Sequence, residues 1–137
     1  MAKFGKRSLD SLNGVHPKLV LIMQEAIKDT PIDFTVIEGV RTVKRQQELY
    51  AQGRTKSGAI VTYADGLTNK SNHQPKSDGY GHAVDIYPFI NGKIDFNNVG
   101  ALKKISDHIK AVARDLKLSI TWGGDWKKPF DPPHFQL

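Results

Sequence analysis

One stretch constrains this chain more than any other: residues 71–85, which read Ser-Asn-His-Gln-Pro-Lys-Ser-Asp-Gly-Tyr-Gly-His-Ala-Val-Asp. The stretch holds two of the five histidines and runs into a short apolar segment, Ala83 to Tyr87, that contains Asp85. The β-forming residues around Asp85 indicate a strand, where a carboxylate is costly to bury unless a cation meets it. We therefore expect Asp85 to lie on a strand, to face a positively charged partner, and to have the rest of the domain built around it.

A metal ion is the partner that the nearby residues favour. The chain has no cysteine, so a tightly bound metal must use histidine and carboxylate ligands, a set that suits Zn²⁺. We interpret His73, Asp85 and His134 as the three ligands of a zinc site. The alternatives are that Asp85 caps a turn or pairs with a surface lysine, and that His73 is a solvated loop residue.

Strand alternation separates the histidines near Asp85. Side chains point to opposite faces of a strand in turn, so Asp85, Ala83 and Gly81 share one face. The two small residues leave room there for an ion and a substrate. His82 falls on the opposite face, so we exclude it from this metal site.

Two further side chains are candidates for catalysis. In polyproline II every third residue returns to the same side, so Asp131 should project with His134, where it could take a proton from water. The alternative is that Asp-Pro-Pro forms an ordinary turn. Arg41 ends a predicted strand, and its guanidinium could hold a carboxylate or an oxyanion, or simply pair with Glu38 or Glu48.

Length and charge bound the organisation of the chain. Its 137 residues indicate one domain, which we expect to be a single catalytic domain over 1–137 without a separate wall-binding domain. A net charge of +6 either serves solubility or attracts a polyanion, which could be nucleic acid or an anionic cell wall. The basic residues are scattered and have no interleaved aromatics, which disfavours nucleic acid as the polyanion. We assign no function to His16 or His108.

The N-terminal residues lack the apolar segment of a signal peptide, and the longest apolar run, Leu19 to Met23, is too short to span a membrane. We therefore expect synthesis in a cytoplasm, no stable membrane association and a monomeric protein.

Hydrophobic periodicity and turn residues predict an α+β fold. Helices are expected at 17–28, at 43–52 after Thr42 as N-cap, and after Asn97 or Asn98, where apolar residues recur at helical spacing. Strands are expected at 32–40, 82–90, 93–96, 118–122 and 133–136, with a hairpin turn at Asn91-Gly92. Residues 1–14 form a lead-in and 53–80 a long, functional or mobile loop. This order predicts about three helices against a small, mostly antiparallel sheet, with the zinc site in a cleft on the sheet.

The spacing of these residues resembles that of a known family. Ser-x-His at 71–73, Gly-x-Ala-x-Asp at 81–85 and a C-terminal Trp…Asp-x-x-His resemble the zinc peptidoglycan peptidases of the LAS group. Within that group the chain is most similar to phage endolysins that cleave L-alanyl-D-glutamate bonds. The similarity covers nearly the whole chain and extends to segments 4–8, 33–35, 38–42 and 90–95. One departure is the spacer from His73 to Gly81, which has five residues more than the family pattern and is expected to loop out.

The resemblance implies roles for residues of this sequence. It places zinc on His73, Asp85 and His134 and the catalytic acid or base on Asp131. It further implies that Arg41 contacts the substrate and the transition state and that Ser71 lies at the substrate. The implied function is lysis of the bacterial host by zinc-dependent hydrolysis of the L-Ala–D-Glu bond of peptidoglycan, reached after the membrane is permeabilised. A D-Ala-D-Ala carboxypeptidase and a non-catalytic, zinc-stabilised wall-binding domain remain the alternatives.

Overall fold

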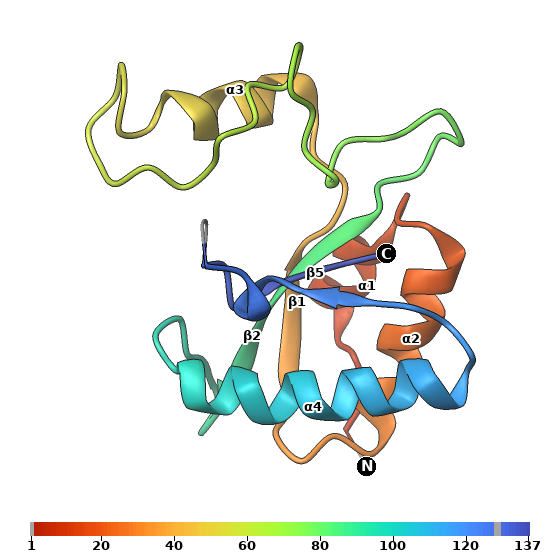
Figure 1. Ribbon diagram of the computed structural model, residues 1–137. Helices are drawn as coiled ribbons and strands as arrows, with labels where there is room; N and C mark the ends of the chain where they lie inside the picture. The colour runs from red at the N-terminus through yellow and green to blue at the C-terminus, as the bar shows by residue number, and fades with distance from the viewer. Residues whose placement is uncertain (1, 128–129) are drawn as a thin grey trace.

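The computed structural model describes residues 2–127 and 130–137, and these contain four α-helices, five short strands and one 3₁₀ turn. Figure 1 shows α4 on one side of the sheet and α3 on the other side, where α3 stands apart from the sheet. In chain order the elements are α1 (Lys6–Leu12), α2 (Pro17–Lys28), β1 (Phe34–Glu38), α3 (Val43–Ala51), β2 (Ala83–Ile90), β3 (Lys93–Ile94), α4 (Val99–Asp115), β4 (Thr121–Trp122), η1 (Gly123–Asp125) and β5 (His134–Gln136).

The sheet is antiparallel at every pairing of the described strands. Its order is β1-β2-β5-β4, and β3 pairs with the far end of β2. The hairpin from β2 to β3 turns at Asn91 and Gly92, whose φ angles of 54° and 76° are those of a two-residue primed turn. The predicted α+β class with a mostly antiparallel sheet is therefore confirmed.

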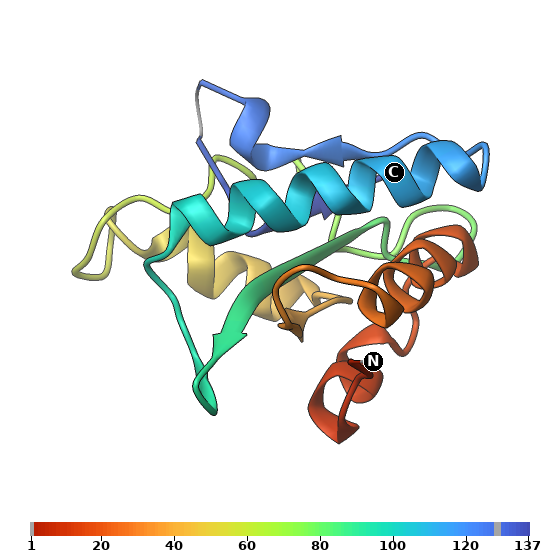
Figure 2. The same ribbon diagram turned by 90° about the horizontal axis from the view of Figure 1, so that it is seen from below.

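The core lies between one face of the sheet and the helices α1, α2 and α4. Figure 2 shows α4 (cyan to blue) close to α2 (orange), and these two helices pack on each other. The α4 positions that face the sheet recur at helical spacing, as the sequence predicts. Buried residues of this core include Leu19, Ile22, Met23, Phe34, Val36, Val84, Ile86, Leu102, Ile105, Ile109 and Phe135. The opposite face of the central strands is left for polar side chains.

A β-bulge in β1 sets which side chains reach that polar face. Val36 pairs with Ile86, but the next pair is Glu38 with Asp85, so Ile37 is the extra residue. Without the bulge, alternation would turn Glu38 toward the core, because one residue of register reverses the face of every side chain. The bulge instead places the Glu38 carboxylate beside Asp85.

The sequence-based boundaries hold best where a cap is present. The helix predicted at 17–28 is α2, and α3 begins after Thr42, whose hydroxyl accepts a hydrogen bond from Arg45 N. Asn98 caps α4 by accepting from Ala101 N. These side chains satisfy backbone N–H groups that a helix start leaves free.

Two elements differ from the prediction. Residues 1–14 contain the helix α1, which has no side-chain cap and is held by packing, since Ser8 is buried and its hydroxyl accepts from Val36 N. The strand predicted at 118–122 is reduced to β4, because Lys117 takes a φ of 60° and the chain first turns away from α4.

Candidate active site

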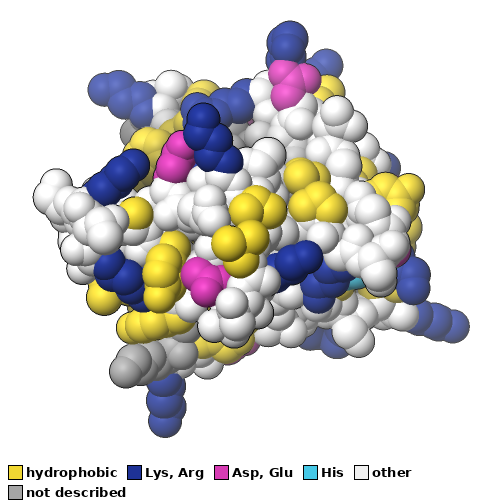
Figure 3. Space-filling model, turned by 90° about the horizontal axis from the view of Figure 1, so that it is seen from above, with side chains coloured by type: hydrophobic (Ala, Val, Ile, Leu, Met, Phe, Trp, Pro, Cys, Tyr) yellow, Lys and Arg dark blue, Asp and Glu magenta, His cyan; other side chains and the backbone are white. Residues whose placement is uncertain are grey.

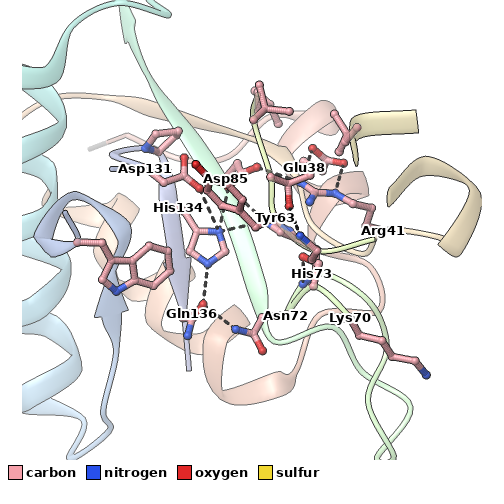
Figure 4. Close-up of a pocket in the computed structure, with 18 of the residues that line it drawn as sticks. Glu38, Arg41, Tyr63, Lys70, Asn72, His73, Asp85, Asp131, His134 and Gln136 are labelled. Carbon is pink, nitrogen blue, oxygen red and sulfur yellow. Dashed lines mark hydrogen bonds and ion pairs between the residues drawn. The ribbon is translucent and has the colours of Figure 1, made fainter. Parts of the chain in front are cut away.

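The candidate site is assembled on the polar face of the sheet (Figure 4). Asp85 lies on the central strand β2, directly opposite His134 on β5 and Glu38 on β1. His73 comes from the long segment between α3 and β2, and the backbone N–H of Arg41 donates to its carbonyl at 2.8 Å. The structure therefore brings together the three side chains predicted as metal ligands, although His73 and His134 are 61 residues apart in the sequence.

The ligand atoms of these three side chains form a nearly equilateral triangle. His73 Nε2 lies 3.2 Å from Asp85 Oδ1, His134 Nδ1 lies 3.4 Å from it, and the two nitrogens are 3.2 Å apart. In a tetrahedral zinc site with ligand distances of about 2.0–2.1 Å, neighbouring ligands are about 3.3 Å apart. The spacing fits Zn²⁺ without rearrangement.

Hydrogen bonds on the far side of each imidazole fix which nitrogen faces the centre as an acceptor. His73 Nδ1 donates to the carbonyl of Gly39 at 2.9 Å, so its Nε2 is the unprotonated nitrogen in the neutral ring. His134 Nε2 donates to Gln136 Oε1 at 2.8 Å, and its Nδ1 is left facing Asp85. Such outer partners orient the imidazole ligands of metal sites.

Asp85 Oδ1 is the third hydrogen-bond acceptor at this centre, beside His73 Nε2 and His134 Nδ1. This oxygen is buried and has no hydrogen-bond partner, a state that is costly unless a cation is present. Burial favours the neutral carboxyl, but positive charge on the adjacent imidazoles of His73 and His134 outweighs it and holds the pKa of Asp85 well below its ordinary value. Burial likewise lowers the pKa of His134, yet its contacts with Asp85 prevail and raise it. The residues present thus demand positive charge at this point.

Arg41 lies under the site and is 7% exposed. Its guanidinium makes a two-pronged contact with Glu38 at 2.9 and 3.0 Å, donates to Gln46 at 2.8 Å, and reaches Asp85 Oδ2 at 3.4 Å. The pairing with Glu38 that the sequence left open is therefore present, and it coexists with a contact to Asp85. Arg41 holds Oδ2 of that carboxylate and leaves Oδ1 to the histidines.

Asp131 reaches the site through a turn and not through polyproline II. His134 N donates to the carbonyl of Asp131 at 3.1 Å, which closes a four-residue turn. The turn is anchored because Trp122 Nε1 donates to Pro132 and Ile86 N to Pro133. It still leaves Asp131 Oδ2 only 3.8 Å from His134 Nδ1, so both side chains face the same cleft. Burial and the charge of Asp85 raise the pKa of Asp131.

A cleft of about 440 Å³ opens over these residues. One wall is formed by the segment after α3, with Val61 to Ala64 and Lys70 to Asn72, and the other includes Trp126, whose ring lies 5.1 Å from that of His134. The backbone carbonyl of Gly123 accepts from Asp131 N at 3.0 Å and so holds the turn that carries Asp131. In Figure 3 the Lys and Arg side chains are spread around the outline of this side of the molecule.

The remaining predicted residue, Ser71, lines the cleft, and its hydroxyl accepts from His73 N at 3.1 Å. Sequence reasoning missed Gln136 and Asn72, whose side chains are joined at 2.8 Å beside His134. Alternation along the predicted last strand was a usable signal for Gln136, since positions 134 and 136 share a face. Asn72 offered no such signal, because its position depends on the path of a long loop.

Comparisons with known proteins find relatives over most of this chain. Residues 1–134 match the model of a family described as phage L-alanyl-D-glutamate peptidase. The L-alanyl-D-glutamate peptidase of Escherichia phage T5 is 32% identical over 129 residues, which cover 94% of this chain and 85% of that protein. The peptidoglycan L-alanyl-D-glutamate endopeptidase CwlK of Bacillus subtilis (strain 168) is 39% identical over 118 residues, 84% of this chain and 66% of that one.

Solved structures show the same similarity. The crystal structure of the Serratia marcescens L-Ala D-Glu endopeptidase ChiX superposes with a TM-score of 0.76 at 32% identity, covering 98% of this chain and 89% of that one. The vancomycin-resistance D,D-dipeptidase VanXYg has a TM-score of 0.51 at 21% identity and shares the fold over 93% of this chain and 49% of its own.

Proposed function

The chain belongs to the phage L-alanyl-D-glutamate peptidase family, and from this premise we propose how it acts as a peptidoglycan L-Ala–D-Glu endopeptidase. We propose that His73, Asp85 and His134 hold a zinc ion and that Asp131 transfers the proton. The observation that carries this proposal is the convergence of two unprotonated imidazole nitrogens and the unpartnered Asp85 Oδ1 at mutual distances of 3.2–3.4 Å. Three acceptors at this spacing repel one another unless a cation lies between them.

Zinc bound by three protein ligands supplies a Lewis acid that polarises a carbonyl and lowers the pKa of water toward ~7. Asp131 lies close enough to this centre to accept the proton of the attacking water and return it to the leaving amine of D-Glu. Its raised pKa suits both tasks, because a carboxyl that is too acidic returns a proton poorly.

Arg41 and Ser71 have positioning roles in this proposal. Arg41 keeps Asp85 Oδ2 hydrogen-bonded, so that Oδ1 alone faces the two histidines, and Ser71 shapes the backbone that carries His73. We also propose that Arg41 and Ser71 contact the peptide substrate, because both residues line the cleft.

An endopeptidase fits this cleft better than a carboxypeptidase does. A carboxypeptidase needs a cation for the terminal carboxylate of its substrate. Of the two cations among the described residues that line the cleft, Arg41 is already compensated by Glu38 and Asp85, and Lys70 belongs to the wall formed by the long segment after α3. The cleft has walls on both sides of the histidines, which suits a chain that continues past the bond. We further propose that the chain acts as one catalytic domain and a monomer on the host wall after the membrane is opened. No helix among the described residues is both long and apolar enough to cross a membrane.

Zinc analysis tests the proposed centre. Purified protein should contain about one zinc per chain, chelation should abolish hydrolysis of peptidoglycan, and added zinc should restore it. Asp85→Asn should lose the zinc of this centre, because an amide neither carries the charge nor offers two equivalent oxygens. Asp107→Asn, at an exposed site on α4 paired with Lys103, is the matched control and should keep it. Active protein without any transition metal would contradict the proposal.

A further inference from the structure

A second cluster of metal-ligating side chains lies outside the active site. His16, Asp78 and His82 each offer one ligand atom, and these atoms lie within 4.8 Å of one another. His82 faces away from Asp85, as alternation predicts, and its Nε2 lies 2.7 Å from Asp78 Oδ2. None of the three takes part in the proposed hydrolysis.

The two histidines of this cluster are held by backbone hydrogen bonds. His16 N donates to the carbonyl of Gly81 at 2.9 Å, and Gly81 N donates to that of Gly14 at 3.1 Å. His82 N donates to the carbonyl of Asn72 at 2.7 Å. The rings of His16 and His82 consequently lie side by side with centroids 5.0 Å apart, although 66 positions separate them by number. Figure 1 shows the light-green segment before β2 running beside the turn between α1 and α2.

Asp78, in contrast, sits on an exposed turn that can adjust. The turn is closed by Lys76 N donating to Tyr80 and by Gly79 N donating to Lys76, and Gly79 has a φ of 83° with open space around it. Asp78 Oδ2 lies 2.7 Å from His82 Nε2 and 3.9 Å from His16 Nε2. These distances bracket the spacing of about 3.3 Å between ligands of a tetrahedral zinc site, so a small shift of one carboxylate equalises them.

We propose that His16, Asp78 and His82 form a second zinc site, weaker than the catalytic one. Two imidazoles and one carboxylate are a donor set that Zn²⁺ accepts. The spacer between His73 and Gly81 is longer than in the family pattern, and this spacer supplies Asp78. An ion bound there ties residues 75–81 to the start of α2 and so fixes the far end of the segment that carries His73.

The hydrogen bonds of the cluster explain why this site is the weaker one. His16 Nδ1 accepts from Lys18 N at 3.1 Å as the N-cap of α2, so the proton of the neutral ring is on Nε2. Binding zinc through Nε2 moves that proton to Nδ1 and gives up the cap, which lowers affinity by about fivefold. Asp78 is also exposed, whereas the unpartnered oxygen of Asp85 is buried.

A zinc titration of the metal-free chain against a chromophoric chelator tests this proposal. Wild type should take up two equivalents, the second at least about fivefold more weakly than the first. Asp78→Asn and His82→Ala should each lose the second equivalent while the first equivalent and hydrolysis stay unchanged. Asp78 is on the surface, so its replacement leaves the core intact. His108→Gln is the control, since His108 contacts the carbonyl of Ala26 and belongs to neither cluster.

The two sites are distinguished by the reciprocal variant. Asp85→Asn should still bind one zinc, at the affinity of the second site, whether or not the proposed catalytic centre is correct. A wild-type titration that ends at one equivalent, with that equivalent retained in Asp78→Asn and His82→Ala, would overturn the second site. So would a second equivalent that persists in both Asp78→Asn and His82→Ala.

Discussion

At the scale of single residues, Asp131 is the side chain that we propose as the proton-transfer group. It is held by a turn whose backbone hydrogen bonds involve Gly123 and His134 and not its own carboxylate. Asp131→Asn should therefore keep the fold and about one zinc per chain while lowering kcat by at least about 10²-fold. Kinetics on soluble peptidoglycan fragments, with zinc content measured on the same samples, check this. Near-normal turnover of the variant would move the base elsewhere, with Glu38 next to examine.

The pH dependence follows from the environment of Asp131. The residue must be ionised to take a proton, so kcat/KM should fall as the pH is lowered through its pKa. Burial and the charge of Asp85 raise the pKa of Asp131 above the ordinary 3.8, so the acid limb should lie above that value. The limb should be missing from the residual activity of Asp131→Asn. A profile of the same shape in both proteins would assign it to another group.

Gln136 orients His134 through its side-chain carbonyl. Gln136→Met has a similar volume but no acceptor, so zinc should bind about 10–100-fold more weakly, as is usual when such a partner of a ligand is lost. Gln136→Glu keeps the acceptor and should retain the affinity. Chelator competition measures both variants, and Gln24→Met, at an exposed position of α2, controls for the substitution itself. Equal affinities in wild type and Gln136→Met would show that β5 alone positions His134.

At the scale of residues, the sequence predicted the side chains that the structure brings together at the candidate site and missed those that orient them. His73, Asp85, His134 and Asp131 stand out because their types and spacings are unusual in an apolar or proline-rich context. The contacts of Gln136 are common polar interactions whose importance appears only once the fold places it beside a histidine. The metal-binding roles of His73, Asp85 and His134, and the roles assigned to Asp131, Arg41 and Ser71, stay predictions.

At the scale of elements, α1 depends on tertiary contact more than on its own sequence. Ser8 is buried and its hydroxyl satisfies the backbone N–H of Val36 on β1. Ser8→Ala leaves that N–H without a partner and should lower the free energy of unfolding by about 1–3 kcal/mol. Denaturant unfolding measures this, with the exposed Ser57→Ala as the control. A loss no larger than that of the control would mean that Val36 is satisfied in another way.

Element boundaries were predictable where a local signal marks them. Thr42, Asn98 and the Asn91-Gly92 turn each determine their own neighbourhood, so α3, α4 and the β2–β3 hairpin begin or turn as expected. The helix α1 has no side-chain cap, and the bulge at Ile37 arises from pairing with a strand 47 positions further along. Neither feature is encoded locally, and the bulge is what brings Glu38 to Asp85 and Arg41.

At the scale of the whole molecule, hydrophobic periodicity and turn residues were enough to predict the α+β class. They do not determine the shape of the expected cleft, because one wall comes from the long segment after α3, which has little regular structure. Gln46 anchors that segment by donating to Thr62 and Ala64, and it is fully buried. Such contacts depend on the path of the loop, which the sequence leaves open.

Product analysis of purified peptidoglycan digested by the zinc-loaded protein identifies which bond is cut. Cutting between L-Ala and D-Glu releases stem peptides from the glycan strands, so the account predicts new N-terminal glutamate among the products. The turbidity of outer-membrane-stripped Gram-negative cells should fall at the same time, and Asp131→Asn with its zinc in place should produce neither change. Release of free D-alanine alone, with no new N-terminal glutamate and unchanged turbidity, would contradict the account and identify a carboxypeptidase.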